Sequence, residues 1–175
     1  MESKAKIFGH SIHQMLIVFP LGLLATSLAF DIAYIFSGDN TFALVSFWMI
    51  AAGICGGLLA AVFGAIDWYE IPQGTRAKAI GAWHGIGNVV VVLLFIVSWF
   101  QRQAVPEEPT RLAIILSVIG VLLALVTGWL GGELVNRLGV GVDDGAHLDA
   151  PSSLSGRPAS DRHIPGSPEL GPRHV

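Results

Sequence analysis

Long stretches without any charged residue most constrain what this chain can fold into. No Asp, Glu, Lys or Arg occurs between Asp39 and Asp67, between Lys78 and Arg102, or between Arg111 and Glu133. Each stretch is longer than the roughly 20 apolar residues that an α-helix needs to cross a bilayer. A fourth apolar run, residues 15–36, is interrupted only by Asp31. The chain is also just 13% charged, against roughly a quarter in an average soluble domain. The sequence therefore predicts an all-α, integral membrane four-helix bundle.

The predicted organisation is one membrane domain followed by a tail. We expect a four-helix domain over residues 1–138, with spans at about 13–36, 42–67, 80–100 and 112–133. Residues 139–175 are rich in Gly, Pro and Ser, and such a segment cannot bury enough apolar surface to offset its ordering entropy. They predict a largely disordered tail whose first part lies against the bundle. No internal repeat with a clear period is evident, although "FGAIDW" and "VTGWLGGE" are loosely alike.

The basic residues predict the orientation of the chain in the membrane. Lys4 and Lys6 precede the first span, and Arg76 and Lys78 lie between the second and third, whereas the connection "SGDNT" has no basic residue. Lys and Arg accumulate in cytoplasmic loops of membrane proteins. We therefore expect both termini and the tail in the cytoplasm, and a first span that is not cleaved as a signal peptide because no convincing small-residue site follows it.

The second span carries small residues at the spacing used for close helix packing. Gly53 and Gly57 are four residues apart, as are Ala60 and Gly64, and small residues at this spacing let transmembrane helices approach closely. In the first span, Pro20 lacks a backbone N–H and is expected to bend the helix.

Cys55 is the single cysteine of the chain. One thiol cannot form an intrachain disulfide, a covalent haem attachment motif or an iron–sulfur cluster. We interpret Cys55 as a small buried hydrophobic residue.

Polar residues that are distant in sequence are predicted to meet at the cytoplasmic face, where the first and third spans begin and the second and fourth end. They are His10, His13, Asp67, Glu70, His84 and Glu133. Histidines at positive helix starts and carboxylates at negative helix ends both oppose the helix dipole. Their common effect is to keep the imidazoles neutral, as ligation requires, and to attract a cation. Asn88 follows His84 one helical turn deeper.

Three interpretations of this face remain open from the sequence. In the first, the carboxylates pair with Arg76, Lys78 and Arg137 and have a structural role only. In the second, a haem b lies between two helices, with His13 and His84 as ligands and His10 as a substitute. Asn88 or Glu133 would then hydrogen-bond the ligands or the propionates.

The third interpretation is a non-haem metal site. Histidines with carboxylates suit iron, manganese or zinc, and the expected ligands are His10, His13, His84, Asp67 and Glu133. His147 in the tail is a further candidate ligand, and His163 and His174 are expected to be solvated.

Four segments, "GHSIHQMLIVFPLGLLATSLAFD", "FGAIDW", "GAWHGIGN" and "TGWLGGELVNRLGVGVDDGAHLDAPSSL", resemble the bacterial membrane family known as domain of unknown function 2231. The resemblance runs from about Phe8 to Leu154. The family's opening usually reads Gly-His-Pro-x-His-Pro, and here Ser11 and Gln14 replace the prolines. The resemblance implies a multi-pass protein of the bacterial inner membrane without an established activity, some of whose relatives are joined to cytochrome-like modules.

We expect a small membrane protein that binds haem b or a divalent metal ion at its cytoplasmic face and serves electron transfer. The alternative is a cofactor-free structural or accessory subunit, or a homo-oligomer, that packs against its partner through the glycine face of the second span. An enzymatic activity of the chain on its own is disfavoured. The sequence has no Ser/His/Asp arrangement, phosphate-binding glycine loop or basic patch, which argues against hydrolase, nucleotide-binding and nucleic-acid-binding functions.

Overall fold

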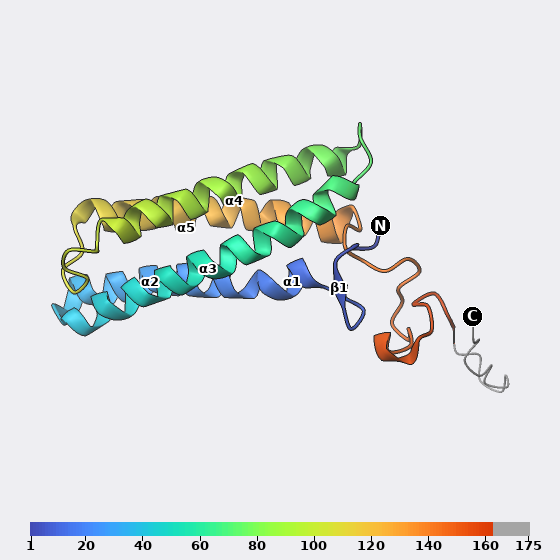
Figure 1. Cartoon of the computed structure of the whole chain (residues 1–175), viewed down its shortest axis with the longest axis horizontal. Helices are drawn as coiled ribbons and strands as arrows, with labels where there is room; N and C mark the ends of the chain where they lie inside the picture. Colours follow the sequence, from blue (N-terminus) through green and yellow to red (C-terminus); the bar gives the residue numbers. More distant parts are fainter. Residues whose placement is uncertain (163–175) are drawn as a thin grey trace.

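Four long apolar helical segments form a bundle in the computed structural model, which describes residues 1–162 (Figure 1). They are α1 (Ile12–Leu16) with α2 (Val18–Ser37), α3 (Asn40–Glu70), α4 (Arg76–Phe100), and α5 (Arg111–Gly132) with the short π-helix η1 (Glu133–Arg137). Each segment is long and apolar enough to cross a membrane. The predicted all-α four-helix architecture is confirmed.

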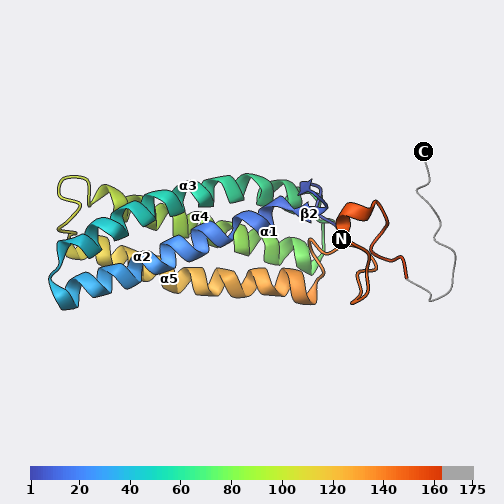
Figure 2. The same cartoon turned by 90° about the horizontal axis from the view of Figure 1, so that it is seen from below.

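Neighbouring helices in the sequence are also neighbours around the bundle. Helix α2 packs on α3, α3 on α4, α4 on α5, and α5 closes the ring against α2. Helices α2 and α4 therefore lie at diagonal corners, and both run away from the end that carries the N-terminus (Figures 1 and 2). Because α1 and α4 begin at this end and α3 and α5 finish there, residues from all four spans can meet at one end of the bundle.

The helix starts are set by side chains that accept hydrogen bonds from the first helical turn. Asp39 accepts from the N–H of Thr41 at 2.9 Å, and Thr75 accepts from the N–H of Lys78 at 3.1 Å. These N–H groups have no partner within the helix, so an N-cap oxygen satisfies them. The first span is interrupted at Ile17, between α1 and α2. Pro20 cannot donate to the carbonyl one turn earlier, which belongs to Leu16, the last residue of α1.

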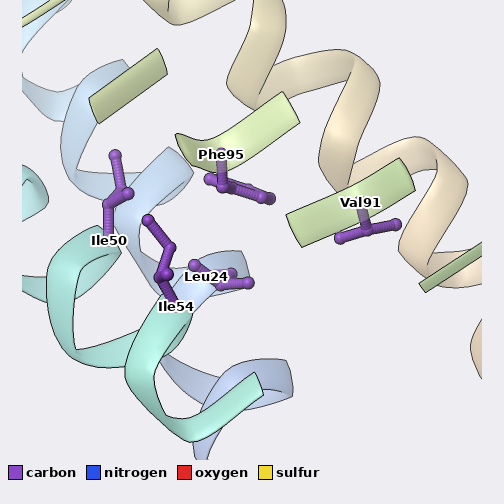
Figure 3. Packing of buried hydrophobic residues seen from close by; sticks show 5 residues of the cluster. All are labelled: Leu24, Ile50, Ile54, Val91 and Phe95. Atoms are coloured by element: carbon purple, nitrogen blue, oxygen red, sulfur yellow. The ribbon is translucent and has the colours of Figure 1, made fainter. Parts of the chain in front are cut away.

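The apolar core lies in the middle of the bundle. Leu24, Ile50, Ile54, Val91 and Phe95 pack there from α2, α3 and α4 (Figure 3). Large apolar side chains also cover the outside of the helices, as is expected for contact with lipid. Polar side chains are buried as well, among them Asp31 and Arg102 toward one end and Asp67 and Lys78 toward the other.

The small residues of α3 pack against other helices of the same chain. A Cβ on Gly53 would lie 2.5 Å from Leu24 Cδ2, and one on Gly57 would lie 3.2 Å from Val92 Cγ2. The glycine face therefore brings α3 close to α2 and α4. Cys55, expected to be buried, is exposed on the outside of α3 instead. It lies two residues from each of these glycines, so its side chain leaves the helix on a different face.

A small hairpin precedes the first span. Strand β1 (Lys6–Ile7) pairs antiparallel with β2 (His10–Ser11). Phe8 and Gly9 form the turn with φ of 50° and 82°, which is typical of a two-residue hairpin loop. The residues before α1 are therefore an extended hairpin and not the start of a helix.

The first part of the tail lies against the N-terminal segment. The N-terminal amine donates to the carbonyl of Gly139 at 3.1 Å, and the N–H of Gly141 donates to the carbonyl of Met1 at 2.9 Å. Lys6 forms ion pairs with Glu2 and Asp143. Farther on, residues 139–162 make turns and the 3-10 helix η2 (Ser153–Ser155) beyond the end of the bundle (Figure 1).

Candidate functional site

Two histidines from diagonal helices approach each other inside the bundle. The ring centroids of His13, on α1, and His84, on α4, are 6.4 Å apart, and the ring planes are nearly perpendicular at 88°. Both rings are near the end of the bundle that carries the N-terminus, as the sequence predicted. Two of the three histidines expected at this face therefore converge.

Each ring is fixed by a backbone carbonyl of the neighbouring helix. Nδ1 of His13 lies 2.8 Å from the carbonyl oxygen of Ala60 on α3, and Nδ1 of His84 lies 2.8 Å from that of Thr127 on α5. A carbonyl can only accept, so Nδ1 carries the proton in both rings. A neutral imidazole protonated at Nδ1 keeps the lone pair of Nε2 for another partner. This is the arrangement found for histidines that bind metals.

Two glycines make room for these rings. A Cβ on Gly64 would lie 2.8 Å from Cε1 of His13, and one on Gly131 would lie 3.1 Å from Cε1 of His84. Each glycine is four residues after the residue whose carbonyl binds the same ring. The histidine, the carbonyl and the glycine thus form the same three-part contact twice, once between α1 and α3 and once between α4 and α5.

The two histidines differ in their further partners. Nδ2 of Asn88 donates to the carbonyl of His84 at 2.9 Å and lies within 3.4 Å of both nitrogens of the His84 ring. Thr127 Oγ1 donates to Asn88 Oδ1 at 2.9 Å. The residue one turn beyond His13 is Ile17, which cannot act in this way. Asn88 therefore acts on His84 as predicted from its spacing, and His84 is the more constrained ring.

The other residues predicted for this site have different partners. His10 lies on β2, is exposed, and has Nε2 3.4 Å from Ser153 Oγ in the tail. Asp67 accepts hydrogen bonds from Ser3 Oγ at 2.7 and 2.9 Å. Glu133 pairs with Arg76 at 2.8 Å.

Within residues 1–162, no three His, Cys, Asp or Glu side chains are close enough to hold a metal ion. The structure does not assemble His10, Asp67 and Glu133 with the histidine pair. Nε2 of His147 lies 3.3 Å from the carbonyl of Asp161 in the tail, and His163 and His174 fall outside the described residues.

A buried ion pair at the opposite end of the bundle was not anticipated from the sequence. Arg102 lies beyond the expected end of the third span, at about residue 100, yet it is fully buried and donates to both carboxylate oxygens of Asp31, at 2.7 and 2.8 Å. Its guanidinium also donates to the hydroxyls of Ser46, Ser98 and Ser117 at 3.2–3.4 Å. The available signal was Asp31 itself, the one charge inside an otherwise apolar span.

Comparison with known families agrees with this architecture. Residues 9–144 match the family described as "Predicted membrane protein (DUF2231)". The chain belongs to this family. The match includes the whole bundle with both His13 and His84, and it confirms the resemblance noted in the sequence and the membrane location. No curated protein and no solved structure matches the chain.

Proposed function

We propose that this chain binds one haem b between His13 and His84 and carries electrons within the bacterial inner membrane. The observation that carries the proposal is the pairing of these two rings, with centroids 6.4 Å apart and Nδ1 of each ring hydrogen-bonded to a carbonyl. The pair lies on the face that the positive-inside rule assigns to the cytoplasm.

The number of donors favours haem over a bare metal ion. Zinc sites in proteins use three or four protein ligands, and the described residues offer no group of three. A haem brings most of its iron's ligands with it, so the two histidines that this chain offers would be enough to hold it.

His13 and His84 would hold the haem through their Nε2 atoms, because Nδ1 of each ring is already hydrogen-bonded to a carbonyl. Haem would supply one-electron redox chemistry at this position. Because His13 and His84 would both serve as ligands, the residues of this chain favour electron transfer over catalysis on a bound substrate.

The residues around the two rings would fix the orientation of the histidines and increase the donor strength of their Nε2 atoms. The carbonyls of Ala60 and Thr127 hold the Nδ1 protons, which fixes the ring orientation and increases the donor strength of Nε2. Asn88 and Thr127 hold His84 further in place. A redox protein of this size needs a partner, so we expect electron exchange with the quinone pool or another membrane complex.

The test is the absorption spectrum of the protein purified in mild detergent, oxidised and dithionite-reduced, with elemental analysis of the same sample. We expect a Soret band that shifts on reduction and is lost in His13→Ala and in His84→Ala. His10→Ala is the matched control, because His10 is exposed on β2, and it should keep the full spectrum. A haem-free protein from cells supplied with a haem precursor would contradict the proposal.

The second candidate is a cofactor-free accessory subunit. It is favoured by the internal partners that both imidazoles already have, because these hydrogen bonds also serve helix packing. Its interface would have to use a surface other than Gly53 and Gly57, which pack within the chain. A featureless spectrum, no stoichiometric metal and co-purification with another membrane protein would support this candidate.

A further inference from the structure

The two halves of the bundle repeat the same packing, residue by residue. His13, Leu24, Ser27 and Asp31 of the first half precede His84, Phe95, Ser98 and Arg102 of the second half by the same interval, with Arg102 two residues beyond the end of α4. The last three pairs are all buried. We infer that the hairpin α1–α2–α3 and the hairpin α4–α5 are two copies of one unit. They are here called the first hairpin and the second hairpin.

The second helix of each hairpin repeats in the same way. A Cβ on Gly53 would meet Leu24 at 2.5 Å, and one on Gly120 would meet the equivalent residue, Phe95, at 2.7 Å. The carbonyls of Ala60 and Thr127 bind equivalent histidines, and Gly64 and Gly131 lie against the same two rings. The three pairs Gly53 and Gly120, Ala60 and Thr127, and Gly64 and Gly131 therefore make equivalent contacts in the two hairpins.

The hairpins are related by an approximate two-fold axis along the bundle. Helices α2 and α4 lie at diagonal corners and run in the same direction (Figures 1 and 2). Under a two-fold axis, a residue meets its own equivalent only at the axis itself. His13 meets His84 near one end, and Asp31 meets Arg102 near the other.

Where Asp31 meets Arg102, the two equivalent residues carry opposite charges. If two first hairpins paired, Asp31 would face Asp31, and if two second hairpins paired, Arg102 would face Arg102. A buried charge without a counterion is strongly unfavourable. When a first hairpin pairs with a second hairpin, the guanidinium forms two parallel hydrogen bonds to the carboxylate, the strongest geometry for such a pair.

We propose that Asp31 and Arg102 are specificity-determining residues that make the first hairpin pair with the second and prevent either from pairing with its own kind. All guanidinium nitrogens of Arg102 have partners in Asp31 and the three serines. The pair is thus a completed contact between the two hairpins, with no donor left for a ligand. The partner recognised by each hairpin is the complementary copy in the same chain.

The test uses full-length chains with like charges at the two positions. Asp31→Arg places two arginines at the axis and Arg102→Asp places two aspartates there. Each variant alone should lose the monomer that melts cooperatively in detergent. The neutral double variant Asp31→Asn with Arg102→Gln should melt between these variants and the unaltered chain, because it removes the attraction without adding repulsion.

Co-expression of the two single variants, with different affinity tags, is the decisive step. The Arg102→Asp chain still has an unaltered first hairpin, and the Asp31→Arg chain still has an unaltered second hairpin. The unaltered first hairpin of one chain can therefore pair with the unaltered second hairpin of the other chain. Roughly ten Gly and Ser residues inserted after Gly74 in both chains lengthen the connection between α3 and α4, so that its reach does not limit the exchange.

We expect the two tagged variants to co-purify as a folded 1:1 species, whereas either variant co-expressed with a differently tagged copy of itself should not. The unaltered chain with the same insertion should remain a folded monomer. Single variants that fold as well as the unaltered chain would overturn the proposal. So would a neutral double variant as unstable as the like-charged ones, or unstable single variants that fail to rescue each other.

Discussion

The ring of His13 occupies the space that a side chain at position 64 would fill. A Cβ on Gly64 would lie 2.8 Å from Cε1 and 2.9 Å from Nδ1 of His13, and Nδ1 is the atom that donates to Ala60. The absence of a side chain at one residue therefore fixes the position of a ring on another helix. The same relation holds between Gly131 and His84, and both ends of the proposed haem site depend on it.

Gly64→Ala should displace the His13 ring and destabilise the bundle by about 1–3 kcal/mol, because a methyl group placed in a filled space forces a shift of its neighbours. Gly128→Ala is the matched control, since nothing lies within 4 Å of a Cβ at that position, and we expect little change. Thermal unfolding in detergent, followed by circular dichroism, measures both. Equal melting temperatures for the two variants would contradict the packing described for His13.

Thr127→Val should loosen His84 without removing the carbonyl that binds its ring. The substitution keeps the side-chain shape but deletes the hydroxyl that donates to Asn88. We expect a loss of about 1 kcal/mol in the free energy of unfolding, the usual net value of one hydrogen bond. Thr26→Val, at an exposed position on α2, should be nearly neutral. If Thr127→Val is also neutral, the hydrogen bond between Thr127 and Asn88 does not constrain the site.

Asp67→Ala should release the N-terminal segment from the bundle. The carboxylate of Asp67 is buried and accepts from Ser3 Oγ and from the N–H of Lys4. Hydrogen bonds to a charged group contribute about 1.5–3 kcal/mol. Hydrogen–deuterium exchange of residues 1–11 should accelerate, while that of the helices remains unchanged. Glu107→Ala, in the exposed connection before α5, is the control, and unchanged exchange in Asp67→Ala would refute the anchoring role.

The contact between the N-terminal segment and the tail should weaken in acid. Lys6 donates to Glu2 at 2.8 Å and the N–H of Asp144 donates to it at 3.2 Å, and these bonds hold the pKa of Glu2 below its ordinary value of 4.5. A carboxyl with a lowered pKa stabilises the folded contact above the ordinary value, and this contribution is lost as the pH falls through the lowered pKa.

Amide exchange at Asp144 should therefore increase, after correction for intrinsic rates, as the pH falls below 4.5. In Glu2→Gln this pH dependence should disappear, and exchange should be elevated at neutral pH as well. An exchange rate at Asp144 that is independent of pH in the original chain would count against this contact.

The four spans were predictable because their signal is local. A helix in lipid must satisfy its own backbone hydrogen bonds and face apolar surroundings, so the charge-free stretches alone define it. The N-caps Thr75 and Thr110 limit α4 and α5 close to the expected boundaries. That His13 and His84 lie at the same end was also predictable, because both stand near the start of a span and alternate spans begin on the same side, whereas the contact between the two rings was not.

The contacts of the remaining polar residues were less predictable. His10 and His13 are only three residues apart, but the turn at Phe8 and Gly9 places His10 on a strand outside the helix. Asp67 and Glu133 are satisfied by the N-terminal segment and by Arg76. A sequence shows that such groups lie near one end of the bundle, but many partners are available there and only their positions in space select one.

The sequence by itself determined that this chain forms four apolar helices and that its histidines near the span starts stand at one end. Only the tertiary structure decided that Arg102 is buried against Asp31 and that the two hairpins repeat each other. The apolar pattern that predicts a helix lies in consecutive residues, whereas the repeat is carried by a few buried positions that are far apart in the sequence. The repeat can be recognised only once both hairpins are packed around one axis, because equivalent residues such as His13 and His84 then meet.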